Sequence, residues 1–295
     1  MNRFPIIHKF IISSLLSISV MMSLSSCHHH DHFIYDDSYS RGINTHITAV
    51  DEDGNTIINS GSTIGVYTED EDGNITFQIV ETDEHGNAVL PVVSEGLGLV
   101  AYLPYQESWD PNDIMNPGIF TVQSSQTSKE LYDASNLMFA SMGSFTRASS
   151  QITFIQALAK IVVKVTDETG SYNLPTSVLT LLDMNDSVEV FLKWLKVETI
   201  AESKQDIVTM NYNSGNDITF FKAIVAPQNI GRGTNFINFK VDNHNLFFSL
   251  PQEAELQSRQ TYTCSLRLTD VGLVYDGSSI TDWEDDGGDI LDGEW

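Results

Sequence analysis

Residues 152–165 read ITFIQALAKIVVKV and form the most continuous apolar stretch of the chain outside its N-terminal segment. β-branched residues fill its second half, and only Lys160 and Lys164 carry charge. An apolar run that is rich in β-branched residues and follows a polar stretch is typical of a strand. We therefore expect a strand over Ile152–Val165.

On both sides of this stretch, short runs of Val, Ile, Phe, Tyr and Thr alternate with clusters of Gly, Asn and Asp, as in β-rich proteins. The other predicted strands are Ile64–Tyr67, Ile75–Val80, Leu97–Leu103, Ile218–Val225, Phe236–Val241, Asn245–Leu250, Tyr262–Leu268 and Val271–Tyr275. Helical periodicity is weak, with candidates at Lys129–Asn136 and Val188–Val197, and the second could equally be strand. The pattern predicts an all-β protein.

A polar stretch, Phe145–Ser150, directly precedes the apolar run and marks a candidate domain boundary. It divides the chain into an N-terminal domain of residues 41–148 and a C-terminal domain of residues 149–295. Both lengths are ordinary for single domains.

An acidic motif that contains glycine recurs at Asp51–Asn55, Asp70–Asn74 and Asp83–Asn87, each time between apolar runs. Asp-Gly and Gly-Asn pairs supply the positive φ angles that tight hairpin turns require. The alternative is calcium binding by the carboxylates, but the spacing does not fit an EF-hand loop. We interpret the three motifs as turns of a β meander.

The N-terminus has the pattern of a secretory signal. Arg3 and Lys9 precede an apolar run, Phe10–Leu24, that is too short to span a bilayer. The sequence Leu24-Ser25-Ser26-Cys27 then resembles a bacterial lipobox. We expect residues 1–26 to be a signal peptide, Cys27 to be lipidated with acyl chains such as palmitate, and residues 27–40 to form a tether. The alternative is a simple cleaved signal with a chance cysteine.

The chain is strongly acidic, with a formal net charge of −25, and loss of Arg3 and Lys9 with the signal would bring it to −27. This charge argues against binding to nucleic acid or to anionic lipid head groups through basic patches. After Cys27, the sequence contains one further cysteine, Cys264, within an alternating pattern. With no partner for a disulfide, Cys264 is expected to be a small buried strand residue.

Motifs of catalysis are not found. The sequence has no phosphate-binding glycine loop, no His-Glu-x-x-His and no Gly-x-Ser-x-Gly. His28, His29, His30 and His32 could bind a transition metal, but a tether offers no second shell, so a solvated spacer is the alternative that we favour. We expect no catalytic residue, metal or cofactor.

Four tryptophans, Trp109, Trp194, Trp283 and Trp295, allow two interpretations. They could form a platform on which sugar rings stack, or they could pack at strand ends inside the fold. Their exposure in the folded chain distinguishes the two.

Several segments resemble the fimbrillin family of Bacteroidia, the Mfa-like and FimA-like subunits of type V pili. The similar segments are Ala101–Tyr105, Ser135–Ala140, Phe154–Val165, Ile224–Gln228 and the pair Tyr262–Leu268 and Ile280–Trp283. No single segment is specific, but their order and spacing extend over nearly all of the chain after the signal.

The resemblance implies two tandem transthyretin-like Greek-key β-sandwich domains after a lipoprotein signal peptide. It also implies assembly by strand exchange, in which an arginine-specific protease removes an N-terminal strand and a neighbouring subunit's strand fills the groove. Arg41 is the predicted cleavage site, because it is the only Lys or Arg between Cys27 and Lys129. Arg147 is a second candidate, and Val271–Trp295 is the predicted donor strand. Alternatively, Arg41 is simply an exposed residue of the tether.

The chain departs from the family pattern in three places. Gln156 stands where the family usually has His, and the common Thr-Arg-Ala near the N-terminus is absent. The segment Ile280–Trp295 contains seven acidic residues, which is unusual for a strand that inserts into an apolar groove. This acidity favours an anchor, tip or accessory subunit over a stalk subunit.

Two functions follow from the sequence. The first is a structural, adhesive pilus subunit that polymerises with like or different subunits and is held in the outer membrane by its lipid, with a surface receptor on a host or bacterial cell. The alternative is a surface glycan-binding lipoprotein that uses aromatic platforms on its sandwiches.

Overall fold

A computed structural model describes residues 45–50, 63–69, 73–83, 87–90, 98–116, 118–143 and 150–283. Cys27, Arg41, Arg147 and Trp295 lie outside the described residues, as do the histidines of the tether, the first turn motif and residues 284–295. Within the described residues, no helix is long and apolar enough to cross a membrane.

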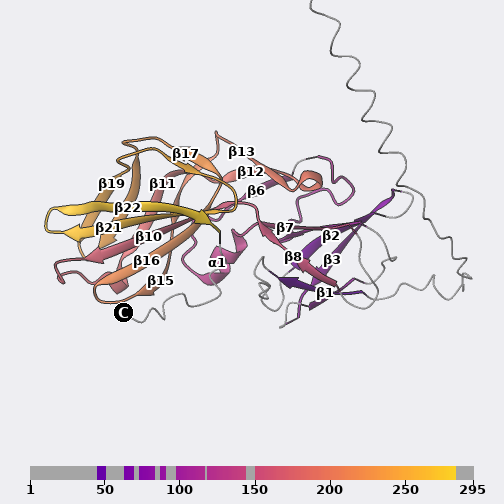
Figure 1. Cartoon of the computed structure of the whole chain (residues 1–295), viewed down its shortest axis with the longest axis horizontal. Coiled ribbons are helices and arrows are strands. Elements are labelled where there is room, and N and C mark those ends of the chain that lie inside the picture. The colour runs from indigo at the N-terminus through magenta and orange to yellow at the C-terminus, as the bar shows by residue number, and fades with distance from the viewer. Residues whose placement is uncertain are drawn as a thin grey trace, which may run out of the picture. The chain divides into compact units, whose positions relative to one another are not determined.

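Strands make up almost all of the regular structure (Figure 1). In the N-terminal half they are β1 (Thr45–Val50), β2 (Thr63–Glu69), β3 (Ile75–Glu81), β4 (Asn87–Leu90), β5 (Gly98–Leu103), β6 (Gly118–Thr121), β7 (Met138–Met142), β8 (Ser150–Thr153) and β9 (Ile155–Gln156). In the C-terminal half they are β10 (Ala159–Asp167), β11 (Val178–Asn185), β12 (Ser187–Phe191), β13 (Lys196–Thr199), β14 (Lys204–Val208), β15 (Met210–Ser214), β16 (Ile218–Val225), β17 (Gln228–Ile230), β18 (Asn235–Val241), β19 (His244–Ser249), β20 (Ala254–Leu256), β21 (Gln260–Thr269) and β22 (Gly272–Asp282).

The helices are short: α1 (Lys129–Ala134) and the 3₁₀ turns η2 (Leu174–Thr176) and η3 (Leu192–Trp194). The predicted helix at Lys129–Asn136 is confirmed as α1, whose first turn is capped by the Ser128 hydroxyl accepting the backbone N–H of Leu131. The second candidate, Val188–Val197, is mainly strand, because β12 and β13 flank η3. The all-β prediction is confirmed.

The N-terminal sandwich pairs two sheets. A five-stranded sheet of order β3-β2-β5-β7-β9 shares one apolar core with a three-stranded sheet of order β4-β1-β8. Ile64, Val66 and Ala101 come from the larger sheet, while Ala88 and Ile152 come from the smaller one, and all five are buried. Alternate residues on the larger sheet point into this core, as the period of two in a strand requires.

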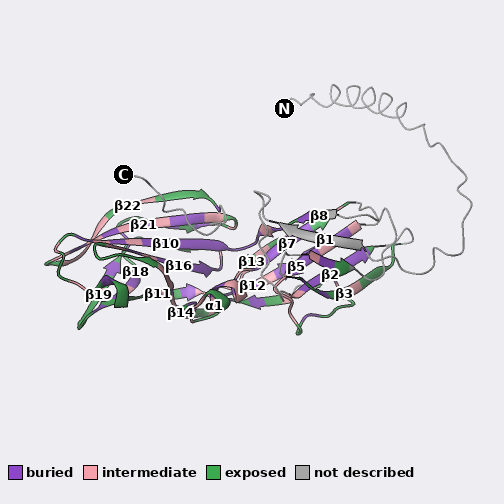
Figure 2. Cartoon of the chain, turned by 90° about the horizontal axis from the view of Figure 1, so that it is seen from below, coloured by how far each residue is buried: buried purple, intermediate pink, exposed green. Residues whose placement is uncertain are grey.

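The C-terminal sandwich is larger. A five-stranded sheet of order β15-β16-β10-β21-β22 and a four-stranded sheet of order β14-β11-β18-β19 contribute to one apolar core. β10 lies at the centre of the first sheet, antiparallel to β16 and parallel to β21, and Figure 2 shows it buried over nearly its whole length. Cys264 on β21 is a free, fully buried thiol, as predicted, and burial raises its pKa to about 12.

The predicted single strand over Ile152–Val165 is wrong in detail. The segment divides into β8, β9 and β10, which pair with β1, with β7, and with β16 and β21 respectively. Phe154 and Leu158 fill the two breaks, and both side chains are buried. The apolar run is continuous because it passes from one core into the next, not because it is one strand.

The chain passes between the sandwiches more than once. β6 pairs with β12, and the segment that follows it reaches β16, where the Gln126 side chain exchanges two 2.8 Å hydrogen bonds with the backbone of Ile224. The Lys222 ammonium lies 4.8 Å from the centre of the Tyr132 ring of α1. The chain then returns to the N-terminal sheet with β7. The division into residues 41–148 and 149–295 stays a prediction, and it has to accommodate these crossings.

Two of the three turn motifs touch the described residues. β2 and β3 form a hairpin in which Gly73 has φ +81°, as the turn prediction requires. After β3, the N–H of Asp83 donates to the carbonyl of Asn87, and the Asp83 carboxylate accepts the N–H of Asn87. β4 nevertheless joins β1 in the other sheet instead of pairing with β3. The expected meander is therefore a hairpin followed by a change of sheet.

Candidate functional site

The N-terminal strand β1 occupies the middle of its sheet. Residues Thr45–Thr48 pair antiparallel with β4, and Ile47–Val50 pair parallel with β8. Without β1, both β4 and β8 would present unpaired backbone groups toward the same gap. The gap would accept a strand of about six residues.

Arg41 precedes this strand by four residues. A cut after Arg41 would therefore leave β1 within the cleaved chain, because β1 begins only at Thr45. The removal of a strand, which the family resemblance implies, does not follow from cleavage at this position. Arg147 falls between β7 and β8, so a cut there would create a new N-terminus just before one neighbour of β1.

The C-terminal strand β22 is an edge strand of the C-terminal sandwich. It pairs antiparallel with β21 from Gly272 to Asp282, and no described strand lies on its other side. The predicted strand Val271–Tyr275 is thus much longer than expected. Figure 2 shows the exposed second half of β22, Ser279–Asp282.

A bulge interrupts β22 near its middle. Ser265 is opposite Gly277, but Leu266 is opposite Tyr275, so Asp276 is the extra residue. Gly277 has φ +135°, a conformation that side chains other than hydrogen rarely allow. Bulges of this kind twist an edge away from further pairing.

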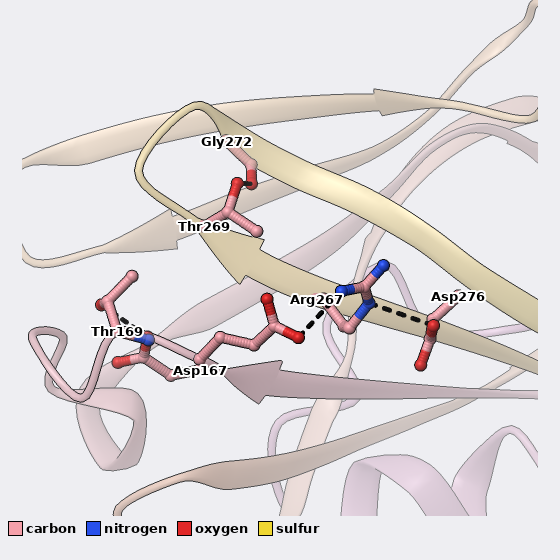
Figure 3. A network of polar contacts seen from close by, with 7 residues as sticks. Asp167, Thr169, Arg267, Thr269, Gly272 and Asp276 are labelled. Carbon is pink, nitrogen blue, oxygen red and sulfur yellow. Dashed lines mark hydrogen bonds and ion pairs between the residues drawn. The ribbon is translucent and has the colours of Figure 1, made fainter.

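An arginine fixes this bulge (Figure 3). Arg267 on β21 donates from Nε to the Asp276 carboxylate at 3.0 Å and from Nη1 to the Glu168 carboxylate at 2.8 Å. Glu168 follows β10 directly, so one guanidinium links three neighbouring strands. All three side chains are substantially exposed, so solvent screens both ion pairs and each contributes little to the stability of the fold.

The turn after β10 holds Glu168 in position. Burial disfavours the charge of Asp167, but the hydroxyl and N–H of Thr169 and the N–H of Tyr172 all donate to its carboxylate. The hydrogen bonds outweigh burial and lower the pKa of the Asp167 carboxyl. The ionised form of Asp167 is therefore the one that orders the turn.

The end of β22 is fastened at the start of β10. The backbone N–H of Trp283 donates to the carbonyl of Arg259, just before β21, at 2.8 Å. The Nζ of Lys160, in β10, lies 5.2 Å from the centre of the Trp283 ring. Trp283 is 6% exposed and Lys160 is 2% exposed. The buried ammonium gains a cation–π contact, and the indole covers it from water.

These contacts change the prediction for the donor strand. Most of the described part of Val271–Trp295 lies in β22, paired with its own β21 and closed by Trp283. To act as a donor, this part would first have to leave its own sheet. Residues 284–295 lie outside the described residues.

The tryptophans do not form a platform in the described residues. Trp109 and Trp283 are buried, Trp194 is 58% exposed, and Trp295 lies outside the described part. The Trp109 ring lies 4.7 Å from the Tyr102 ring, and its indole N–H donates to the carbonyl of Ile119 at 2.9 Å. This is the packing role, so the glycan-binding alternative loses its main motive.

Metal chemistry has no support among the described residues either, since no three His, Cys, Asp or Glu side chains gather there. Gln156 lies buried in β9 and takes no part in a polar cluster. The sequence patterns missed the two contacts that define the C-terminal edge. The Asp276-Gly277 pair was the one local signal of the bulge, and nothing local indicated that Lys160 would meet Trp283.

The chain matches the model of the fimbrillin-like family over residues 42–283. A candidate cell adhesion protein from Bacteroides ovatus has a similar crystal structure, with a TM-score of 0.64 at 16% identity, covering 82% of this chain and 98% of that one. A second candidate cell adhesion protein, from Bacteroides uniformis, gives a TM-score of 0.61 at 13% identity, with coverage of 82% and 98%. These likenesses show the fold.

No curated protein matches the sequence. The family match covers most of the chain and includes both sandwiches. The family is fimbrial, so its members are subunits of cell-surface pili. The chain therefore belongs to the fimbrillin-like family.

Proposed function

We propose that the chain is a lipid-anchored subunit of a cell-surface pilus that joins its neighbours by strand exchange at the position of β1. One observation carries the proposal: the first described strand is the central strand of a three-stranded sheet, flanked by β4 and β8. A central strand at the start of a fold leaves a complete slot when it is displaced. An incoming strand would gain hydrogen bonds on both sides as well as side-chain pockets.

Cys27 supplies the anchor in this proposal. Signal cleavage before Cys27 would leave the lipid on the first residue, with residues 27–40 as the tether to the outer membrane. Several acyl chains together give stable attachment, since each buried CH₂ contributes about 0.8 kcal/mol. The tether is short, so the slot of β1 would be held close to the membrane until the chain is cut.

Cleavage after Arg41 would separate β1 from that tether. The new N-terminus would lie four residues before β1, and the strand could then leave its sheet without dragging a lipid. Exchange would proceed by displacement of β1, not by its proteolytic removal. Arg147 is the weaker candidate, because a cut there would break the connection to β8, a wall of the same slot.

The C-terminal segment stays the proposed donor strand of this chain, but it is a poor one. Six acidic residues lie between Glu284 and Trp295, and an acidic strand suits an apolar slot poorly. An anchor, tip or accessory role follows for this subunit, with another subunit supplying the strand that enters its slot. A host or bacterial surface receptor remains part of the proposal for a tip or accessory role.

The test uses the full chain in a bacterium that builds pili of this family. Wild type, Cys27→Ala, Arg41→Ala and the matched control Arg147→Ala are compared by labelled-palmitate incorporation, by N-terminal sequencing of surface protein and by heat-stable oligomer ladders. We expect Cys27→Ala to lose the label, and Arg41→Ala to lose the ladder while keeping the label. A wild-type precursor that takes up no label before cleavage, or ladders whose subunits keep Cys27 as N-terminus in wild type, would contradict the proposal.

A further inference from the structure

The edge strand β3 is built differently from a protected edge. It pairs with β2 over seven residues from Ile75 to Glu81 without a shift in register, and no described strand lies on its outer side. It contains no proline, no lysine and no bulge. Those are the devices that normally prevent edges from pairing with other chains.

β3 also presents an apolar stripe. Ile75, Phe77 and Ile79 point to the same face, and Ile75 and Ile79 are 44% and 52% exposed. Phe77 anchors the stripe because its ring lies 4.8 Å from the Tyr67 ring and 6.1 Å from the Tyr105 ring. The stripe is therefore held firmly by an aromatic cluster and is not an isolated exposed side chain.

The aromatic cluster depends on one glycine. Gly65 is opposite Tyr102 in the sheet, and a Cβ at Gly65 would lie 2.3 Å from the Tyr102 ring. Tyr102 thus lies flat over Gly65 and contacts Tyr67, whose ring centre is 6.3 Å away. The aromatic cluster that packs against Phe77 therefore depends on the absence of a side chain at Gly65.

The stretch that forms this edge is uncharged as far as the last residue of β3. The eight residues Gly73–Val80 carry no charge in a chain whose formal net charge is −25. Acidic residues bound this stretch, with Asp72 before it and Glu81 as the last residue of β3. An uncharged, apolar edge in so acidic a chain fits a partner surface that is itself uncharged and apolar.

The stripe is symmetric about its centre. The order Ile75, Phe77, Ile79 is the same in both directions, so two antiparallel copies would place Ile75 of each opposite Ile79 of the other. Such a contact is isologous, with a two-fold axis at Phe77. In this register Glu81 would lie opposite Gly73 of the second copy, so within the paired strands no carboxylate would lie opposite another.

We propose that two copies of this chain associate side by side through β3, forming a continuous antiparallel sheet across the pair. The acidic, glycine-rich residues 284–295 are a poor alternative occupant, because β3 is flanked by carboxylates on the same chain. An interface of one strand per copy is smaller than the roughly 1,000 Å² expected of a stable complex, so the pairing is weak in dilute solution. Attachment of both copies to one surface would raise their effective concentration.

Disulfide trapping tests the register directly. Full-length chains with Ile75→Cys or Ile79→Cys, carrying different tags, are produced in the same cells and oxidised. In the proposed register, residues 75 and 79 of different copies are direct neighbours, about 5 Å apart at Cβ, within reach of a disulfide. Residue 75 of one copy is roughly 13 Å from residue 75 of the other, because four residues of about 3.3 Å each separate them along the strand.

We therefore expect the mixed pair to cross-link several-fold more than either variant with itself. Native Cys264 does not cross-link because it is fully buried. The wild-type chain measures any cross-linking through Cys27. Val271→Cys, at a residue 91% exposed, measures random collisions. Mixed cross-linking no higher than that of Val271→Cys would overturn the proposal. Efficient cross-linking of Ile75→Cys with itself would also overturn the proposal, because it indicates parallel pairing. Cross-linking of either variant to a different protein would overturn it as well.

Discussion

β22 and β3 are both edge strands of five-stranded sheets, yet they end their sheets in opposite ways. β22 is bulged at Asp276, bound to its neighbours through Arg267, and closed by buried Trp283. β3 is regular, uncharged from Ile75 to Val80, and carries the exposed apolar side chains of Ile75 and Ile79. The C-terminal edge is protected against added strands, whereas the described residues give the N-terminal edge no such protection.

The difference shows how one chain controls where it associates. Protection of β22 uses contacts from distant segments, whereas openness of β3 needs only a regular strand on a packed face. A family that assembles at the cell surface needs both, since an unprotected edge at each end would permit uncontrolled aggregation. Substitutions at the two strands can therefore be chosen to expose the β22 edge or to block the β3 edge.

Trp283→Ala should have the largest effect. Truncation of a buried tryptophan costs about 3–5 kcal/mol of unfolding free energy, and here it also uncovers the buried Lys160 ammonium. We expect a large fall in the stability of the C-terminal sandwich by denaturant unfolding and early hydrogen exchange along β22. Trp194→Ala is the matched control, because Trp194 is 58% exposed and its loss should cost much less. Equal losses would show that Trp283 does not close the edge.

Gly65→Val tests the support of the open edge. The added Cβ would lie 2.3 Å from the Tyr102 ring, so Tyr102 and its aromatic neighbours must move. Overpacking of this kind costs about 1–3 kcal/mol. The stability of the N-terminal sandwich should fall, and cross-linking through residues 75 and 79 should fall with it. Gly98→Ala is the control in the same sheet, since its Cβ would lie 4.0 Å from the Met142 carbonyl oxygen. If Gly98→Ala lowers the stability as much as Gly65→Val does, the close approach of Tyr102 to Gly65 is not the cause of the loss.

Much of this architecture was predictable from local pattern. β2, β3 and β16 follow alternating or apolar runs, and the hairpin follows the Gly73 turn. Such features depend on residues that are adjacent in sequence. The all-β class and the family likewise follow from segments whose order was readable before any contact was known.

The remainder depends on contacts between distant segments. The run Ile152–Val165 looks like one strand because burial in two different cores leaves the same apolar signature as burial in one. β4 pairs with β1, a strand of the other sheet, and no local spacing encodes that pairing. The protected edge at β22 likewise requires Lys160 to meet Trp283 and Arg267 to meet Glu168.

Acid should open the β22 edge before the β3 edge. The pKa of Asp167 is lower in the folded chain than in the unfolded chain, so its stabilising contribution is complete above about pH 4 and is lost as pH falls toward the folded value. Asp167→Asn should cost about 1 kcal/mol at neutral pH, because the amide replaces a charged acceptor. The difference in melting temperature between Asp167→Asn and wild type should shrink as pH falls below about 4. Hydrogen exchange should show β22, not β3, losing protection. A constant difference down to pH 2 would exclude this role for the carboxylate.

Ile79→Lys should have the smallest effect on folding and a selective effect on association. Ile79 is 52% exposed, so its replacement should change the unfolding free energy by less than about 0.5 kcal/mol. A lysine at this position places a charge in the paired edge, where its desolvation opposes pairing. We expect weaker self-association of the full chain by sedimentation equilibrium. Val271→Lys makes the same charge change at an exposed turn and should leave association as in wild type.

Salt separates the two forces that act on this pair. Two chains of charge −25 repel, and raising ionic strength from about 0.1 M to about 1 M shortens the screening length from about 10 Å to about 3 Å. Association of wild type should therefore strengthen with salt, unlike a complex held by opposite charges. Self-association of the Ile79→Lys variant should stay weak at both salt concentrations, because the substitution removes an apolar contact, which salt does not restore by screening long-range charge. If Ile79→Lys and Val271→Lys associate equally at both, β3 is not the open edge.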